Sequence, residues 1–409
     1  MKDPAGTPAR RAALRMLDAV LRRGETLDVA ESAAAKGLLP ADRALARAIS
    51  SEALRWLVDL DALIDSATKQ RLPDDAKPRM VLRMMLAQWL RLDTPPHAVV
   101  ATGLQLLTGG PRRLAHGVFS TLNKRGVTLP AAPTLPPEVA ARWGERADAI
   151  AAGLANPPPL DLTLRDPAGA EELAAALDGV SLAPGHVRLQ RGLTVERVRG
   201  FEQGEWWVQD LAASLPARLL GQGDGRRVLD LCAAPGGKTL QLAAAGWQVT
   251  ALDVSDKRLD RLRQNLARPG LSADIVVADA LPWEPAEPYD AILLDAPCTS
   301  TGTCRRHPDV IHRIGPRQVE EMAELQAALL ARAAGWLKTG GTLVYAVCSL
   351  EREEGEGQAE AVSLDPLPIA AEELVAGLRP TAEGWLRTDP GMLPEAGGMD
   401  GFFVARWQK

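Results

Sequence analysis

Apolar side chains recur at helical spacing through the first third of the chain. Leu14, Leu17 and Leu21 form one stripe, and Thr7 and Pro8 before it suit an N-cap and a first helical position. A Pro-Pro pair at 95–96 ends this pattern. We therefore predict that residues 6–126 are helical and that their Met and Trp side chains form core rather than a ligand site. Two further stripes consist of Leu45, Ile49, Trp56, Leu60 and Leu63, and of Met80, Met84, Met85 and Trp89.

The pattern changes after residue 126. Residues 127–137 are rich in proline and show no periodicity, which is typical of a linker. Shorter elements follow and predict a small α+β unit. Helices are expected at 138–154, 171–177 and 209–220, and alternating residues predict strands at 160–165 and 186–190.

From Val228 onward, short apolar runs alternate with helical patterns. This alternation predicts a parallel sheet between layers of helices, and such sheets bind ligands at the carboxyl ends of their strands. Strands are expected at 228–231, 248–252, 274–277, 291–294, 342–346 and 401–407, with helices that include 257–267 and 317–336. Potentially reactive or acidic residues stand at the predicted carboxyl ends, namely Cys232, Asp253, Asp279, Asp295 and Cys348.

These patterns predict three domains. An all-α domain is expected at 1–130, a linker helix with a small α+β subdomain at 131–210, and an α/β domain at 211–409. No apolar stretch reaches about 18 residues and the first residues lack an apolar leader core, so we expect a cytoplasmic protein that does not enter a membrane. The four cysteines form no CxxC pair, which argues against a disulfide framework and a structural zinc site.

Charge is distributed unevenly along the chain. Residues 1–130 contain 20 Lys and Arg against 13 Asp and Glu, a net +7, which leaves −12 for the remainder of a protein whose net charge is −5. A basic N-terminal part suggests contact with a polyanion, although a solvated helical surface explains the charge equally well. Much of the positive charge comes from Arg10, Arg11, Arg22, Arg23, Arg112, Arg113, Lys124 and Arg125.

The run VLDLCAAPGGKTLQL joins a predicted strand to a helix through a glycine-rich turn. Such a turn lets the backbone approach a nucleotide-like ligand closely. The run matches neither GxGxxG nor GxxxxGK[ST], and Asp230 makes the surroundings negative. A cationic ligand without phosphates suits this turn, and S-adenosylmethionine carries a sulfonium and an ammonium. An ordinary strand-to-helix turn is the alternative.

Acidic residues at the next strand ends extend this expectation. Asp253 is placed to bind both ribose hydroxyls, and Asp279 to contact the adenine side. Either residue alone could simply cap a following helix. Asp295 begins the run DAPC, which presents Cys298, while Cys348 follows another strand. Free cysteines usually lie in the core, so two at strand ends suggest chemistry.

Cysteine suits one methylation in particular. C5 of cytosine is a poor nucleophile, and a thiolate added to C6 pushes electron density onto C5. Asp295 could donate a hydrogen bond to N3 of the ring if the site keeps it protonated when needed. Near Cys298, Arg305 and Arg306 could hold phosphates. His307 is expected to be structural or phosphate-facing rather than a general base, and Cys232 and Cys304 are expected to be structural.

The runs LDLCAAPGGKT, LDAPCTSTGTCRRHPD, LKTGGTLVYAVCS and DGFF resemble the Sun/Nop2 family of RNA cytosine-5 methyltransferases, from about residue 140 to the end. The helical start resembles the RNA-binding domain of the antitermination factor NusB. This combination is similar to the bacterial members of the family that modify small-subunit ribosomal RNA. The resemblance implies a class I methyltransferase domain, Rossmann-like, with a mostly parallel seven-stranded sheet. S-adenosylmethionine is the implied cofactor.

The resemblance also implies roles for the site residues. Cys348 is the implied nucleophile and Cys298 the assisting cysteine. The resemblance further implies cofactor contacts at Cys232, Ala233, Ala234, Pro235, Gly236, Gly237, Lys238, Asp253, Asp279 and Asp295. Sequence reasoning alone does not order the two cysteines, since DNA cytosine-5 enzymes use a Pro-Cys nucleophile, which would point to Cys298. Val347 departs from the family, which usually has Thr before the catalytic Cys.

The implied partner is small-subunit ribosomal RNA, with a monomer, no metal and no membrane expected. The same chemistry on transfer RNA is one alternative. A non-catalytic RNA-binding assembly factor is another, against which the intact Cys298 and Cys348 argue. The missing GxGxxG disfavours an NAD-linked oxidoreductase.

Overall fold

The computed structural model describes residues 6–409. Their internal contacts divide these residues into two compact units. The first comprises the described residues up to Asn156 together with Cys304–Ile314, and the second comprises Pro157–Thr303 together with Gly315–Lys409. No helix among residues 6–409 is long and apolar enough to span a membrane.

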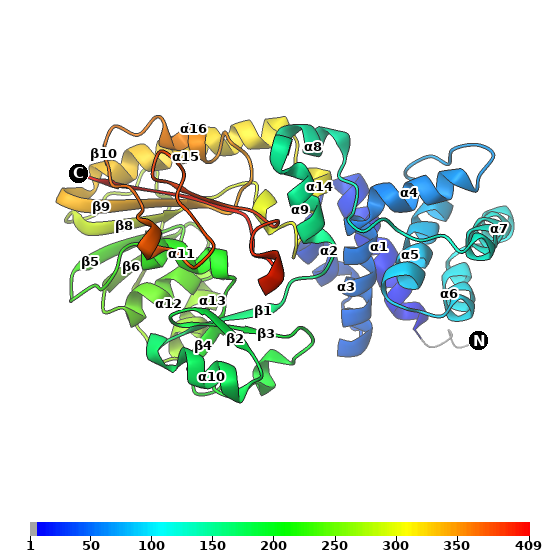
Figure 1. Cartoon of the computed structure of the whole chain (residues 1–409), viewed down its shortest axis with the longest axis horizontal. Coiled ribbons are helices and arrows are strands. Elements are labelled where there is room, and N and C mark those ends of the chain that lie inside the picture. Colours follow the sequence, from blue (N-terminus) through cyan, green and yellow to red (C-terminus); the bar gives the residue numbers. More distant parts are fainter. Residues whose placement is uncertain (1–5) are drawn as a thin grey trace. The chain divides into compact units, whose positions relative to one another are not determined.

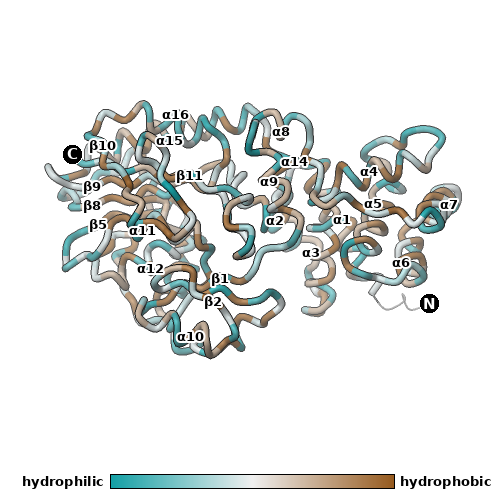
Figure 2. Tube along the Cα trace, viewed as in Figure 1, coloured by the Kyte–Doolittle hydropathy of each residue, from teal (hydrophilic) through white to brown (hydrophobic). Residues whose placement is uncertain are grey.

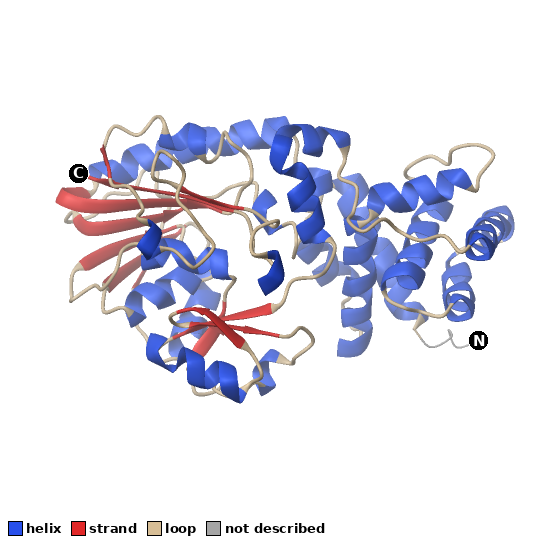
Figure 3. Cartoon of the chain, viewed as in Figure 1, coloured by secondary structure: helices blue, strands red, loops and turns tan. Residues whose placement is uncertain are grey.

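The first unit, within its described residues, contains helices and no strand (Figure 3). Proline occupies the first turn of five of them, where its missing N–H is not needed. The α-helices are α1 (Thr7–Arg23), α2 (Leu27–Ala34), α3 (Pro40–Arg55), α4 (Leu57–Ser66), α5 (Lys77–Arg91), α6 (Pro96–Gly103), α7 (Gly109–Arg125), α8 (Pro137–Trp143), α9 (Ala147–Leu154) and α14 (Val310–Arg313).

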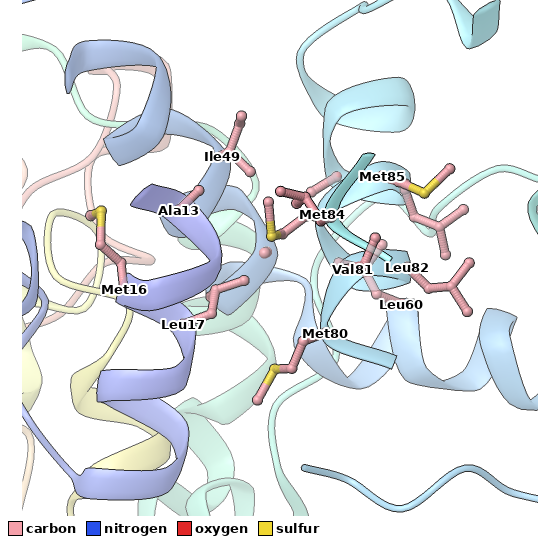
Figure 4. Packing of buried hydrophobic residues seen from close by; sticks show 14 of the residues in the cluster. Ala13, Met16, Leu17, Ile49, Leu60, Met80, Val81, Leu82, Met84 and Met85 are labelled. Carbon is pink, nitrogen blue, oxygen red and sulfur yellow. The ribbon is translucent and has the colours of Figure 1, made fainter. Parts of the chain in front are cut away.

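The predicted apolar stripes meet in the core of this unit. Figure 4 shows Leu17 of α1, Ile49 of α3 and Met84 of α5 among the buried side chains packed between these helices. Each of the three is at most 1% exposed. The prediction that the methionine stripe is core is therefore confirmed.

Three details of the helices differ from the prediction. Gly6, not Thr7, is the N-cap of α1, because φ of 80° places Gly6 in the left-handed region and Thr7 is already helical. The second stripe belongs to two helices, since α3 ends and α4 begins around Trp56. The helix predicted at 138–154 is interrupted at Gly144, where φ is 55°, and forms α8 and α9.

The second unit begins with a small antiparallel sheet, as the α+β pattern predicted. Its strand order is β2-β3-β1-β4, and α10 (Ala170–Ala176) packs against it. The buried Asp161 accepts two hydrogen bonds of 2.7 Å from Arg188 and one of 3.0 Å from the Leu211 amide, which ties this sheet to the next helix. The strands are β1 (Leu160–Leu164), β2 (Val180–Ala183), β3 (His186–Leu189) and β4 (Trp206–Val208).

The large sheet of this unit is mixed and mostly parallel. Seven strands run in the order β10-β12-β9-β8-β5-β6-β7, and β11 pairs with β12. Strands β5 to β9 pair in parallel, whereas β12 is antiparallel to β9, β10 and β11. The bounds are β5 (Arg227–Leu231), β6 (Gln248–Asp253), β7 (Asp274–Val277), β8 (Tyr289–Asp295), β9 (Leu337–Val347), β10 (Asp365–Pro366), β11 (Leu386–Thr388) and β12 (Phe402–Gln408).

Helices cover both faces of this sheet, because its central strands are apolar on both sides. Figure 2 shows β5, β8 and β9 as mostly hydrophobic. Val228 packs with α11 (Leu211–Arg218) and α12 (Gly237–Ala244), while Leu229 and Leu231 face α15 (Pro316–Gly335). Helix α13 (Asp256–Ala267) packs beside α12, and the short α16 (Glu356–Ala359) follows β9. The structure therefore has the predicted order of parts, a helical domain followed by an α/β domain with a mostly parallel sheet.

Candidate active site

The parallel strands place the predicted site residues along one edge of the large sheet. The register pairs Leu231 with Leu252 and with Leu294, and Asp295 with Ala346, so the carboxyl ends of β5, β6, β8 and β9 lie at similar levels (Figure 1). Five residues that end or follow these strands and β7 therefore share this edge. They are Cys232, Asp253, Asp279, Asp295 and Cys348.

The glycine-rich turn between β5 and α12 leaves no room for a side chain at Gly236. Gly236 has a φ of 107°, and a Cβ there would lie 2.9 Å from Cγ of Leu262. The Ala233 amide donates to the Leu252 carbonyl at 3.0 Å, and the Ala234 amide donates to Oδ2 of Asp253 at 3.2 Å. The backbone of the turn is thus fastened to β6, with the N-terminal amides of α12 at the strand edge.

The acidic residues near the turn differ in environment. Asp253 is 2% exposed and also accepts a bond of 2.9 Å from the Ser255 amide. Asp279 is exposed and accepts from the Leu281 amide at 3.0 Å. Asp230 lies buried beneath the turn, where Thr239 donates to it at 2.5 Å, and burial raises the pKa of Asp230 to about 7. Asp253 and Asp279 can therefore accept further hydrogen bonds from a ligand. Asp230 instead binds Thr239 and stabilises the start of α12.

Lys238 of the turn forms an ion pair across the edge. Its Nζ lies 2.8 Å from Oδ2 of Asp295 and 5.2 Å from the ring centre of Phe402. Burial alone would lower the pKa of Lys238, but the charge of Asp295 outweighs burial and raises this pKa. Lys238 is therefore a buried cation that Asp295 balances.

A cavity of about 640 Å³ opens beside this ion pair. Lys238, Asp295 and the turn form one wall. Strand β4 with residues on either side of it and helix α13 form the others. Such a volume is typical of sites for small molecules and cofactors. Its lining includes Trp207, Gln209, Pro235, Gly237, Arg261 and Asn265.

The two candidate cysteines meet at the same edge. Sγ of Cys298 lies 3.5 Å from Sγ of Cys348, and both residues are half-buried. The hydrogen bond from Cys298, aided by Lys238, lowers the pKa of Cys348 below that of an ordinary thiol. The same bond and burial raise the pKa of Cys298 well above it. The pair can therefore share one proton, with the thiolate on Cys348 and the thiol on Cys298.

The other two cysteines are placed differently. Cys232, which has a φ of 65°, lies at the start of the turn, and burial raises the pKa of its thiol. Cys304 is buried in the first unit. Neither residue is placed in an environment that would make a reactive thiolate.

Of the two arginines after Cys298 that were expected to hold phosphates, Arg305 is buried. Arg305 is 1% exposed, and its carbonyl accepts a hydrogen bond of 2.8 Å from Arg55 within the first unit. The hypothesis that Arg305 holds phosphates is therefore wrong. His307 lies 3.7 Å from Asp28 in that unit, and burial lowers the pKa of His307, which agrees with a structural role.

Two site residues were missed by the sequence interpretation. Glu354 is fully buried behind the cysteines, and Gln326 of α15 donates to it at 2.9 Å. Glu354 stands in the run EREEGE, which has the composition of a solvated surface. Only its distance of six residues from Cys348 could have drawn attention to it.

Comparison with known proteins places these features in a family. Residues 217–408 match the family described as 16S rRNA methyltransferase RsmB/F, and residues 7–108 match the NusB family. Ribosomal RNA small subunit methyltransferase B of Xanthomonas campestris pv. campestris is 33% identical over 427 residues, which cover 98% of this chain and 97% of that protein.

Solved structures extend the likeness to the fold. The structure titled PH0851 matches over 100% of both chains with a TM-score of 0.73 and 22% identity. The structure of NSun6 from Pyrococcus horikoshii with SFG covers 67% of this chain and 98% of that chain, with a TM-score of 0.58 and 20% identity. The fold of this chain thus has precedents among solved structures.

Proposed function

Because the chain belongs to the ribosomal RNA small subunit methyltransferase B family, we propose that it methylates C5 of a cytosine in small-subunit ribosomal RNA through a covalent cysteine adduct. The observation that carries this proposal is the pair of thiols 3.5 Å apart at the strand edge that also holds the glycine-rich turn. A methyl transfer to nitrogen or oxygen needs no such pair, whereas C5 must first be activated by addition at C6.

The methyl donor of this enzyme is S-adenosylmethionine, which supplies a methyl group on a positively charged sulfonium. The structure fits this cofactor, since Gly236 gives the turn a left-handed φ of 107° and the buried Asp253 carboxylate lies at the same edge. In our proposal Asp253 holds the ribose hydroxyls and Asp279 the adenine side. The remaining cofactor contacts are Cys232, Ala233, Ala234, Pro235, Gly236, Gly237, Lys238 and Asp295.

Cys348 is the proposed nucleophile. Its thiolate, which the Cys298 thiol and the Lys238 ammonium both stabilise, adds to C6 and forms a carbon–sulfur bond. The electron pair of the C5–C6 double bond moves onto C5, which then takes the methyl group. Methyl transfer neutralises the sulfonium, and the ring remains attached to Cys348.

Cys298 is proposed to assist release of the methylated ring. In this step the C5 proton passes to water, its electron pair restores the C5–C6 double bond, and the bond to Cys348 breaks. Cys348 leaves as a thiolate, and the Cys298 thiol 3.5 Å away is placed to donate a hydrogen bond to it. The raised pKa of Cys298 keeps that proton available.

Asp295 is the proposed partner of N3. Lys238 donates a hydrogen bond to Oδ2 of Asp295 at 2.8 Å. To donate a hydrogen bond to N3, the Asp295 carboxyl group must carry a proton while the ring is bound. The ring needs this bond because addition of the thiolate gives it negative charge. Lys238 would meanwhile neutralise the charge that remains.

A basic helix face supports the RNA partner. The arginines of the first unit commonly form ion pairs, as Arg43 does with Glu31 at 2.6 Å. Arg112, Arg113 and Lys124 of α7 are exposed, and none of them pairs with a carboxylate among residues 6–409. Helix α7 contains no acidic residue. Unpaired cations on one helix suit the phosphates of RNA.

This RNA contact can be tested with a triple substitution of Arg112, Arg113 and Lys124 to Ala. Affinity for ribosomal RNA should fall, and the slope of log affinity against log salt should shrink by roughly 2–3, because about 0.7–0.9 counterions are released per phosphate contact. Replacing the exposed, paired Arg22, Arg23 and Arg43 with Ala is the matched control. Equal salt slopes for both variants in a filter-binding titration would remove α7 from the RNA surface.

The reaction itself is tested with purified small-subunit RNA, transfer RNA and S-adenosylmethionine. Nucleosides from each digested RNA are separated and weighed by mass spectrometry. We expect 5-methylcytidine in the ribosomal sample. Methylation of transfer RNA alone would overturn the proposed substrate, and a methyl group at another ring position would overturn the chemistry.

A further inference from the structure

One carboxylate lies between the two cysteine-bearing loops. Glu354 follows Cys348 by six residues and is fully buried. Its Oε2 accepts hydrogen bonds from the Thr299 amide at 2.8 Å and from Nε2 of Gln326 at 2.9 Å. Its Oε1 accepts from the hydroxyl of Thr299 and, at 2.9 Å, from the hydroxyl of Ser349. The four bonds occupy both oxygens.

The partners of this carboxylate are the neighbours of the two cysteines. Thr299 directly follows Cys298, and Ser349 directly follows Cys348. Gln326 also donates at 2.8 Å to the carbonyl of Pro297, so both residues that flank Cys298 are held. A single side chain therefore fastens the two loops to each other and to α15.

We propose that Glu354 is a positioning residue that sets the separation of Cys298 and Cys348. This inference rests on the proposed function, because the separation matters to catalysis only if the two thiols act together. Glu354 itself touches neither sulfur in the hydrogen-bond network and acts through Thr299 and Ser349. Loss of its carboxylate would remove the link through Thr299 and Ser349, although the Gly302 amide would still donate to the Cys348 carbonyl at 3.0 Å. The separation of the two sulfurs should therefore change while the two loops stay joined.

The hydrogen-bond partners of Glu354 allow two of its effects to be tested separately, the positioning of the loops and the negative charge of the carboxylate. The Thr299 amide and the Gln326 amide group can only donate, whereas the two hydroxyls can also accept. In Glu354→Gln the amide oxygen can take the place of Oε2, and the NH₂ group can donate to the hydroxyls of Thr299 and Ser349. This variant keeps the network without a charge. Glu354→Ala removes the network, and Glu353→Ala, on the exposed neighbour, is the matched control.

The first test measures the thiols and needs neither RNA nor cofactor. Iodoacetamide reacts with thiolates, so the pH at which Cys348 is half-alkylated reports how well Cys298 supports its negative charge. Peptide mass spectrometry follows each cysteine separately. In Glu354→Ala this midpoint should lie at higher pH than in Glu354→Gln, which lacks the same charge but keeps the network, while Glu353→Ala should match the wild type. The other charged groups that act on Cys348, Asp295 and Lys238, are unchanged in all variants. The charge of Glu354 helps to raise the pKa of Cys298, and this charge is absent from both Glu354→Ala and Glu354→Gln, so the difference between these two variants reports the network alone.

The second test measures the methyl transfer of folded protein. Misplacement of reacting groups by about 1 Å costs on the order of 100-fold, so kcat of Glu354→Ala should fall by roughly 10- to 100-fold. KM for S-adenosylmethionine should not change, because the turn and Asp253 do not contact Glu354. A merely structural role would lower the melting temperature and leave kcat of the folded fraction intact. The conservative Glu354→Gln should restore kcat.

The outcomes separate this inference from the proposed function. An unmoved Cys348 midpoint and wild-type kcat in Glu354→Ala would overturn the positioning role while methylation still occurs. A moved midpoint without 5-methylcytidine from the wild type would overturn the proposed function instead. If Glu354→Ala does not fold, Ser349→Ala provides the second variant. It removes the hydroxyl that joins Glu354 to the Cys348 loop, together with the contacts of this hydroxyl to Thr299, Thr301 and the Glu351 amide, and must raise the same midpoint.

Discussion

The two halves of the candidate site are held by different parts of the chain. The cofactor turn is shaped by backbone, with Gly236 at a φ of 107° and amides bonded to β6. The cysteine loops are held by side chains, through Glu354, Gln326, Thr299 and Ser349. The conformation of a region that is held by its backbone depends on the positions of its glycines. A region that is held by side chains can place two reactive atoms within a few ångströms of each other, and a single substitution can change that separation.

The largest expected effect comes from breaking the cysteine half. Cys348→Ala removes the proposed nucleophile, so no adduct forms and methylation should stop. Cys298→Ala leaves attack and methyl transfer possible but should slow release, so the protein should remain covalently attached to methylated RNA. Denaturing gel electrophoresis after incubation with RNA and S-adenosylmethionine separates these cases, because a slow band is expected for Cys298→Ala only.

The remaining cysteines provide a control for that experiment. Cys304→Ala alters a buried thiol of the first unit and should show neither effect. A slow band with Cys348→Ala and none with Cys298→Ala would make Cys298 the nucleophile, as in the DNA enzymes. Normal turnover by both variants would contradict the covalent mechanism.

The backbone half should respond to pH through Asp230. Because burial raises the folded-state pKa of Asp230 from 3.8 to about 7, the stability that its protonated form contributes is fully present below about pH 4 and is lost as the pH rises through about 7. The loss amounts to at most about 4 kcal/mol, at roughly 1.4 kcal/mol per unit. Asp230→Asn stays neutral, so its urea midpoint should fall less than that of the wild type between pH 5 and pH 8.

An exposed acid supplies the comparison for Asp230. Asp260→Asn changes a residue on the surface of α13, where a carboxylate remains solvated. This variant should follow the wild-type pH dependence. Parallel curves for Asp230→Asn and the wild type would show that Asp230 carries its charge without cost.

A smaller effect is expected from Asp253, whose side chain binds the backbone of the cofactor turn. Asp253→Ala removes the proposed ribose contact together with the bond to the Ala234 amide. The affinity for S-adenosylmethionine should fall by about 1–3 kcal/mol, while kcat at saturating cofactor should change little. Calorimetric titration measures this, with Asp260→Ala as the control. Unchanged affinity would exclude Asp253 from the cofactor site.

The same contrast explains what the sequence could predict. The turn was predictable, since a strand, a glycine pair and a helix start follow one another in the chain. The strands at 228–231 and 274–277 were also predictable from short apolar runs between helical patterns. Cys348 and Cys298 were expected at one edge because parallel strands align their carboxyl ends. Each of these signals is local, or follows from one rule about sheets.

What escaped prediction depends on contacts between distant residues. Nothing in EREEGE separates the buried Glu354 from the exposed Glu353, because burial is decided by α15 and by the loop after Cys298. Arg305 has the composition of a phosphate contact but is buried against Arg55, 250 residues earlier. The strands β10 and β11 have two and three residues, too few for a periodic pattern.

The position of residues 304–314 has a consequence for the order of folding during synthesis. These residues belong to the first unit, where Arg55 donates to the Arg305 carbonyl and Asp309 accepts from the Leu27 amide at 3.2 Å. A chain that emerges from the ribosome N-terminus first contains the other residues of this unit long before the segment appears. The helical unit therefore reaches its final structure only after most of the sheet strands have been synthesised. Residues 6–156 are thus made first but complete their packing only when residues 304–314 arrive.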